Sequence, residues 1–173
     1  MAGEETGKTV SNLTHSQVQT MLGSIGILKG YGVYIPANNT QLLDWALAEE
    51  FRSLGALPSY IEARSQFASE IEVIWIDHKH DLISAAFEVE HSTPVYSGLL
   101  RFNDLLLTCE TSSRFFVVSN ESRRDLFVRQ LQRPTFQRSG LSELASFLDY
   151  SNVFDWHRRL ADSGGSPPGS RPP

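Results

Sequence analysis

The stretch that decides the fold reads IEVIWID over Ile71–Asp77 and LISAAFEVEHS over Leu82–Ser92. Its first part is a run of β-branched and aromatic residues, which is typical of a central strand that is covered on both faces. The intervening residues, HKHD, predict a tight turn. The sequence therefore predicts an antiparallel strand pair in the middle of a sheet.

The second of these strands carries carboxylates where its neighbours demand burial. Glu88 and Glu90 are two positions apart, so both side chains leave the same face, whereas Phe87 and Val89 leave the other. Close carboxylates repel one another and burial adds to that cost, which a divalent cation such as Mg²⁺ relieves. Glu72, on the first strand, offers a third carboxylate. Spacing alone favours a plainer explanation, in which this face is a solvated sheet edge or pairs with arginines.

Helical and strand patterns flank the pair on both sides. Helices are predicted over 15–29, 40–54 (with Thr40 as N-cap), 93–109, 122–132 and 142–148, and further strands over 32–36 and 114–119. Residues 59–69 form either a helix or a loop. This order predicts a single-domain, three-layer α/β fold, with a mixed central sheet that contains the antiparallel hairpin and helices on both faces.

Length and composition fit one globular domain. The chain has 173 residues, of which 40% are apolar and 20% charged. We expect a domain over 14–160 between a disordered start (1–13) and a disordered Gly/Ser/Pro-rich tail (161–173). No apolar stretch approaches the ~18 residues that a membrane span needs, and no secretory signal is visible. The single Cys109 suits a reducing compartment, so we expect a cytoplasmic protein.

The net charge of −5 does not favour nucleic-acid binding, which gains much of its affinity from neutralised phosphates. Residues 121–138 are an exception, because five arginines stand there against two acids. Arg123, Arg124 and Arg129 are therefore candidates for a phosphate-binding patch. A solvated helix face explains these arginines at least as well.

Several blocks between Thr14 and Phe136 resemble one group of known proteins. They are THSQVQ from Thr14, IEVIW from Ile71, AFEVEHST from Ala86, YSGLLR from Tyr96 and RPTF from Arg133. Together they resemble small stand-alone bacterial proteins with the PD-(D/E)XK, or restriction endonuclease-like, fold. The block from AFEVE to YSGLLR is fairly specific, whereas three acids alone would be a weak signature.

The resemblance implies a metal-dependent nuclease. In that fold an acid on one strand and an acid-x-Lys on the next hold the metal and position the attacking water. Glu72 takes the first acid's place, Glu88 the second and Glu90 the lysine's. Gln17 stands where related folds have a helical glutamate. The implied cofactor is Mg²⁺, or Mn²⁺, and the implied reaction is hydrolysis of DNA phosphodiester bonds in restriction, repair or defence.

Two departures from the pattern leave an alternative open. Glu72 replaces the usual Asp, and Glu90 cannot offer the positive charge of the usual lysine. The chain would then be a catalytically weakened module that binds nucleic acid or a partner protein on the same fold. A homo-oligomer is equally compatible with the sequence.

Arg101 lies in the helix that follows the acidic strand, with Ser97 four residues earlier on the same helix face. Both residues, together with the start of that helix, are candidates to bind a phosphate. An ion pair between Arg101 and Glu88 or Glu90 is the other possibility.

Overall fold

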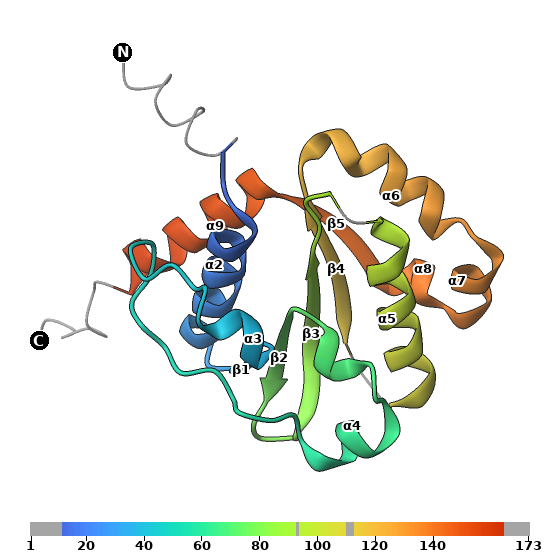
Figure 1. Cartoon of the computed structure of the whole chain (residues 1–173), viewed down its shortest axis with the longest axis horizontal. Helices are drawn as coiled ribbons and strands as arrows, with labels where there is room; N and C mark the ends of the chain where they lie inside the picture. The colour runs from blue at the N-terminus through green and yellow to red at the C-terminus, as the bar shows by residue number, and fades with distance from the viewer. Residues whose placement is uncertain (1–11, 93, 110–112, 165–173) are drawn as a thin grey trace, which may run out of the picture.

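A five-stranded mixed sheet forms the centre of the computed structural model, which describes residues 12–92, 94–109 and 113–164 (Figure 1). The strand order is β1-β2-β3-β4-β5. The first two pairs in this order are antiparallel and the last two are parallel. The strands are β1 (Gly32–Tyr34), β2 (Val73–Asp77), β3 (Leu82–Val89), β4 (Arg114–Ser119) and β5 (Ala145–Asp149). The predicted mixed sheet with its β2–β3 hairpin is confirmed.

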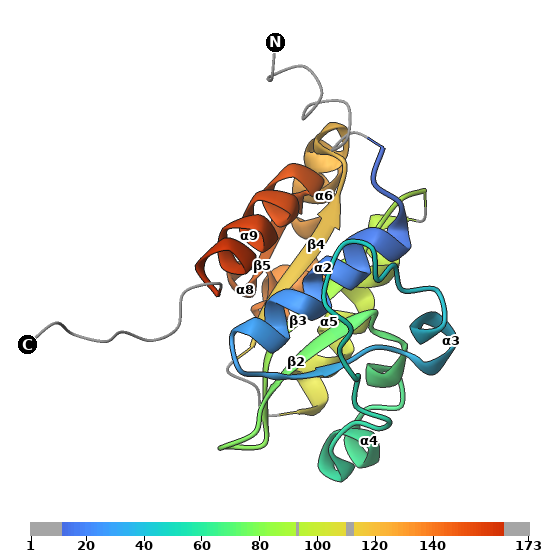
Figure 2. The same cartoon turned by 90° about the vertical axis from the view of Figure 1, so that its left-hand side faces the viewer.

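Helices cover both faces of this sheet, as predicted. On one face α2 (His15–Leu28) and α9 (Tyr150–Ser163) lie side by side (Figures 1 and 2). On the other face α5 (Val95–Thr108) packs against the sheet, and α6 (Arg124–Leu131), α7 (Pro134–Ser139) and α8 (Leu141–Leu144) lie around it. Shorter helices complete the chain: α3 (Ala37–Thr40), α4 (Ser59–Arg64), and the 3-10 turns η1 (Ala68–Glu70) and η2 (Glu121–Arg123).

Successive side chains of β3 point into two different hydrophobic cores, one on each face of the sheet. Ala86 packs in the core under α5, whereas Phe87 and Val89 pack in the core under α2 and α9. Glu88, two positions after Ala86, therefore belongs to the face that α5 covers. A carboxylate thus enters the α5 core at the carboxyl end of β3.

The predicted helix over 40–54 is wrong. Helix α3 ends at Thr40 instead of starting there, and turns follow it. The backbone groups of this segment bond to other elements: the Asp44 amide donates to Thr20 Oγ1 at 2.9 Å, and the Leu54 amide donates to the Val33 carbonyl at 2.7 Å. These tertiary partners replace the helical ladder that local sequence favoured.

The predicted helix over 142–148 is also wrong. Helix α8 ends at Leu144, and the next residues form β5, which pairs in parallel with β4. Helices α7 and α9 lie outside the ranges predicted above as helices. Helix α9 begins with a capping box between Asp149 and Asn152.

The remaining differences are shifts of element ends. Strand β2 starts at Val73, just after Glu72, and β3 ends at Val89, just before Glu90. Leu13, predicted to be disordered, is buried. Helix α9 runs to Ser163, inside the predicted disordered tail. The rest of the two predicted disordered ends, residues 1–11 and 165–173, lies outside the described residues.

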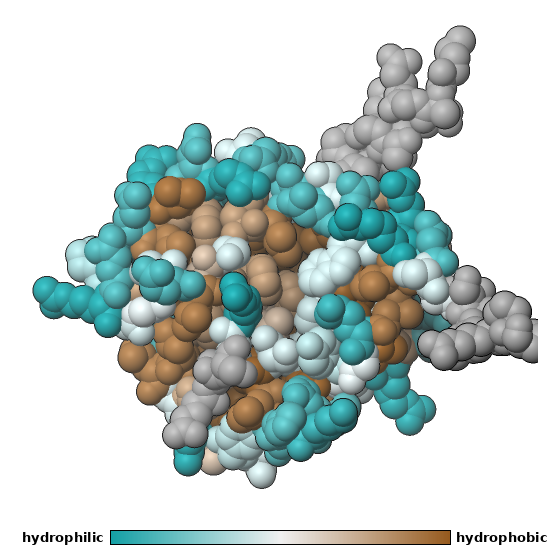
Figure 3. All heavy atoms as spheres, turned by 180° about the vertical axis from the view of Figure 1, so that it is seen from behind, coloured by the Kyte–Doolittle hydropathy of each residue, from teal (hydrophilic) through white to brown (hydrophobic). Residues whose placement is uncertain are grey.

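No helix in the described part of the chain is long and apolar enough to cross a membrane. On the rear face apolar side chains gather in patches that polar side chains border (Figure 3). Leu42 and Leu107 are the most exposed large apolar side chains of the described residues, at 63% and 65%.

Candidate active site

Glu88 forms a buried, two-point ion pair with Arg101 of α5. Arg101 Nε donates to Glu88 Oε1 at 2.6 Å and Nη2 donates to Oε2 at 3.1 Å. The side chain of Glu88 is 1% exposed and that of Arg101 is 26% exposed. Burial raises the pKa of Glu88 to about 8, although the hydrogen bonds and charge of Arg101 oppose the shift. Spacing alone favoured either a solvated sheet edge or a pairing with arginines for this face, and Glu88 has the second arrangement.

Glu72 forms a second pair with His15, at the start of α2. His15 Nε2 lies 2.6 Å from Glu72 Oε1, and the Val89 amide donates to Oε2. The hydrogen bond to Glu72 is the main cause that raises the pKa of His15, and the charges of Glu90 and Glu88 raise it further, against burial. Glu72 therefore links α2 to the end of β3.

Glu90 is buried at 2% exposure, and its backbone is held by neighbouring elements. Its amide donates to the Val118 carbonyl at 2.8 Å. Its carbonyl accepts from Ser119 Oγ at 2.6 Å and from the Tyr150 hydroxyl at 2.9 Å. His91 Nδ1 bonds to the same hydroxyl, and burial is the main cause that raises the pKa of Tyr150 to about 12. β4 and α9 thus fix the position of Glu90 after its strand has ended.

Gly98 brings α5 close to the carboxylates. A Cβ atom at this position would lie 3.0 Å from Glu90 Oε1 and 3.1 Å from Glu88 Cβ and Cγ. Contacts this short are tighter than side chains normally make, so glycine permits the helix to approach. The structure therefore gathers the three predicted acids, Arg101 and His15 at the carboxyl end of β3, where each acid acts on the charge of Arg101 and of His15.

Comparison with known proteins assigns the chain to a family. Residues 2–160 match the family model of the type II restriction enzyme NmeDI C-terminal domain. The chain belongs to this family. It is 31% identical over 134 residues to the type II restriction enzyme NmeDI of Neisseria meningitidis serogroup C, an overlap that takes in 71% of this chain. The chain spans only 37% of that enzyme's length. No solved structure matches the chain.

The family assignment confirms the predicted relation to restriction enzymes. It does not reach the PD-(D/E)XK superfamily or the roles of single residues, and these stay predictions. The helices on both faces and the mixed sheet are compatible with a restriction endonuclease-like fold.

The donor chemistry of the carboxylate cluster fits a hard divalent cation, because carboxylate oxygens are the ligands that Mg²⁺ prefers. Its present arrangement does not close around one: no three His, Cys, Asp or Glu side chains among the described residues are placed to hold a metal ion. Arg101 forms an ion pair with Glu88, and His15 pairs with Glu72. A cation at Glu72 and Glu88 must therefore replace these two partners.

Other predicted site residues lie in different surroundings. The side chain of Gln17 bonds to the Thr14 amide, which caps α2, and to Asp44. Ser97 is half-buried on α5. Arg124 pairs with Glu121 on the surface, and Arg129 is exposed on α6. Arg123 donates to the His91 carbonyl at 3.4 Å, close to the end of the acidic segment.

Three residues that touch the cluster were missed by sequence reasoning. His15 and Gly98 stand inside blocks that carry the family resemblance, so their presence in those blocks was a usable signal. Tyr150 lies in a segment predicted to follow a helix, and nothing local indicated that its hydroxyl reaches Glu90. All three place or neutralise carboxylates rather than adding new ones.

Proposed function

We propose that this chain is a metal-dependent nuclease that hydrolyses phosphodiester bonds of DNA, as part of a restriction activity. The similarity to a type II restriction enzyme supports the restriction role, and the cluster at the end of β3 supports the chemistry. Membership of the PD-(D/E)XK superfamily belongs to the same proposal. The substrate is DNA, whose strandedness the experiment below determines.

One observation carries the proposal: Glu88 and Glu90 are 1% and 2% exposed, next to Glu72. Taking a charge out of water costs several kcal/mol even after relaxation, and like charges add to that cost. A chain under selection for stability alone would lose such a cluster readily, because apolar side chains fill the same space at lower cost. The cluster is therefore best explained by chemistry that needs carboxylates.

The residues of the chain take the following roles in this proposal. Glu72 and Glu88 would hold Mg²⁺ or Mn²⁺, which would supply positive charge to the phosphate and lower the pKa of a bound water. Glu90, fixed through its own backbone by Ser119 and Tyr150, orients the water or accepts its proton. Arg101, once Glu88 is released from it, offers two parallel N–H donors to a phosphate oxygen pair. His15 neutralises part of the charge of Glu72 until the metal binds.

A second function is favoured by the same ion pairs. Arg101 and His15 already pair with two of the three carboxylates, so these two groups have partners without a metal. The chain would then bind DNA or a partner without cutting. The two functions share the fold and differ in whether Glu88 leaves Arg101.

The test uses the full chain with supercoiled plasmid, short duplex and single-stranded DNA, each with Mg²⁺, Mn²⁺ or EDTA. The nuclease predicts metal-dependent cleavage that Glu88→Ala abolishes and that Glu121→Ala, the same change in an exposed pair, leaves intact. Calorimetric titration of Mn²⁺ must show binding in the wild type. DNA binding without cleavage in any metal supports the binding module, and absence of metal binding overturns the nuclease.

A further inference from the structure

Arg101 holds a carboxylate that the proposed reaction assigns to a metal. Its Nε and Nη2 donate to the two oxygens of Glu88 at 2.6 and 3.1 Å, so each oxygen already has a charged partner. The guanidinium also brings positive charge to the place where a cation must approach, and like charges repel. While this pair is closed, Glu88 is therefore a poor metal ligand.

The two members of this pair differ in how they meet the solvent. The Glu88 side chain is 1% exposed, whereas that of Arg101 is 26% exposed. A ligand from solution therefore reaches the arginine more easily than the carboxylate. Glu88 does not release the arginine to water alone, because a buried carboxylate without a charged partner carries a large desolvation cost. Release therefore requires an anion for Arg101 and a cation for Glu88 together.

The shape of the guanidinium selects the anion. Its planar fork presents two parallel N–H donors, which match two oxygens on one atom, as in a carboxylate or a phosphate. A phosphodiester offers such a pair in its two non-bridging oxygens. The charges that act on Arg101 include those of Glu88, Glu90 and Glu72, so a cation bound to these acids also weakens their hold on the arginine. The two exchanges therefore favour each other.

We propose that the Arg101–Glu88 pair is a latch, which opens when a phosphodiester phosphate takes the two N–H donors of Arg101 and thereby frees Glu88 to bind Mg²⁺. This inference rests on the proposed nuclease function and adds the regulation of the same site. Phosphate and metal then bind with positive coupling, each raising the affinity of the other by the same factor. Without DNA the closed latch keeps the affinity of the cluster for metal low.

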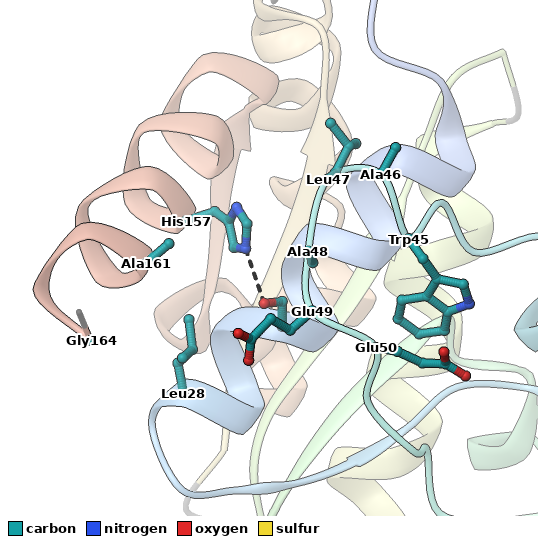
Figure 4. A pocket seen from close by; sticks show the side chains of 11 residues that line it. Leu28, Trp45, Ala46, Leu47, Ala48, Glu49, Glu50, His157, Ala161 and Gly164 are labelled. Carbon is teal, nitrogen blue, oxygen red and sulfur yellow. Dashed lines mark hydrogen bonds between the residues drawn. The ribbon is translucent and has the colours of Figure 1, made fainter.

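An acidic pair elsewhere must be separated from this site in a metal titration. Glu49 and Glu50 line an open cavity of about 720 Å³ beside α2 and α9. Figure 4 shows Glu49 directed toward Leu28 and His157, and Glu50 beside Trp45. None of the three acids of the cluster lines this cavity. The variant Glu49→Gln with Glu50→Gln therefore reports metal that is held outside the cluster.

The experiment measures Mg²⁺ affinity by calorimetry without DNA at pH 9, where Glu88 is ionised because its pKa is about 8. The wild type is compared with Arg101→Gln and Arg101→Lys, after circular dichroism confirms that each folds. We expect Arg101→Gln to bind Mg²⁺ roughly tenfold more tightly, because Glu88 is released. Arg101→Lys keeps the charge but loses the two-point pair, so we expect a smaller gain.

Two controls test whether a general change of charge has the same effect. Arg158→Gln removes one positive charge from an exposed pair with Asp155. Glu49→Gln with Glu50→Gln removes the acidic pair of the cavity. Both proteins should bind Mg²⁺ with the affinity of the wild type.

A second arm adds dimethyl phosphate, a phosphodiester without base or sugar, to the same titrations, with sodium chloride at equal ionic strength as the control. We expect dimethyl phosphate to tighten Mg²⁺ binding to the wild type and not to Arg101→Gln, in which the latch is already open. If Arg101→Gln does not fold, the wild type and Arg101→Lys decide: the gain from dimethyl phosphate must be smaller in Arg101→Lys.

The other outcomes overturn the latch or separate it from the nuclease. Equal or weaker Mg²⁺ affinity in Arg101→Gln overturns the latch. An equal gain from dimethyl phosphate in the wild type and the Arg101 variants also overturns it, because the phosphate then acts on the metal directly. If the wild type still cleaves DNA with Mg²⁺, the nuclease stands without the latch. Coupled release in a protein that does not cleave DNA supports the latch in a binding module, and absence of Mg²⁺ binding in every variant overturns both.

Discussion

Two arginine–glutamate pairs of this molecule have nearly the same geometry in opposite surroundings. In Arg101–Glu88 the two donor–acceptor distances are 2.6 and 3.1 Å, and in Arg124–Glu121 they are 2.6 and 3.0 Å. The glutamate side chain is 1% exposed in the first pair and 57% exposed in the second. The two pairs therefore differ in burial and not in contact geometry, and only the buried pair carries a large desolvation cost. This burial marks the end of β3 as the candidate site.

The largest difference is expected when each arginine is removed. Arg101→Met leaves Glu88 buried without its partner, which costs about 3–5 kcal/mol of unfolding free energy at pH 9, where Glu88 is ionised in the wild type. The cost should shrink at pH 6, where Glu88 keeps its proton and needs no counter-ion. Urea unfolding at the two pH values measures this. A loss below about 1 kcal/mol is the size expected of an exposed ion pair, and it would contradict a special role for burial in Arg101–Glu88.

The second largest effect is expected in the pH dependence of stability, which should follow the ionisation of Glu88. Its folded pKa, about 8, lies above the model-compound value of 4.5, so the folded state holds the proton that the unfolded chain releases. Stability of the wild type should therefore fall, relative to Glu88→Gln, as pH rises from about 4.5 to 8, by up to about 1.4 kcal/mol per pH unit. Unfolding curves of both proteins at four pH values test it. Parallel pH profiles would contradict a buried, titrating Glu88.

A smaller, pH-dependent effect is expected at His15. Its raised pKa means that the bond to Glu72 stabilises fully below the unfolded value of 6.5, and that this contribution is lost as pH rises through the folded pKa. His15→Gln should cost about 1 kcal/mol at pH 6 and less at pH 9. His80→Gln removes a histidine whose side chain is 68% exposed and pairs with Asp77, so it serves as the control. An equal loss at both pH values would show that His15 acts through packing alone.

The smallest effect belongs to the surface pair. Arg124→Met breaks contacts between half-exposed side chains, so we expect a loss of 0 to about 1 kcal/mol. Added salt should reduce even that, because it screens exposed charges. Thermal unfolding in low and high salt measures both. A loss as large as that of Arg101→Met would remove the contrast between the two pairs.

The predictable part of this molecule is the part governed by short-range patterns. The β-branched run before Asp77 predicted the central hairpin, and the two-residue spacing of Glu88 and Glu90 predicted one shared face. The family blocks then supplied a predicted role for each acid, which remains a prediction. These features need no knowledge of distant contacts.

The rest depends on contacts between distant residues. His15 reaches Glu72 across 57 positions, and Tyr150 reaches Glu90 across 60. The segment over 145–149 becomes a strand only because β4 offers its edge, which local propensity does not reveal. Burial of Glu88 follows from the same packing, since Gly98 lets α5 cover it.

The most direct test of the central claim compares the two glutamates of these pairs in one assay. Plasmid nicking by the full chain is measured with saturating Mg²⁺ or Mn²⁺ for the wild type, Glu88→Gln and Glu121→Gln, after unfolding midpoints confirm that all three fold. The nuclease predicts that Glu88→Gln lowers the rate at least ~100-fold, whereas Glu121→Gln matches the wild type. Equal rates in all three proteins, or no metal-dependent cleavage by the wild type, would contradict it.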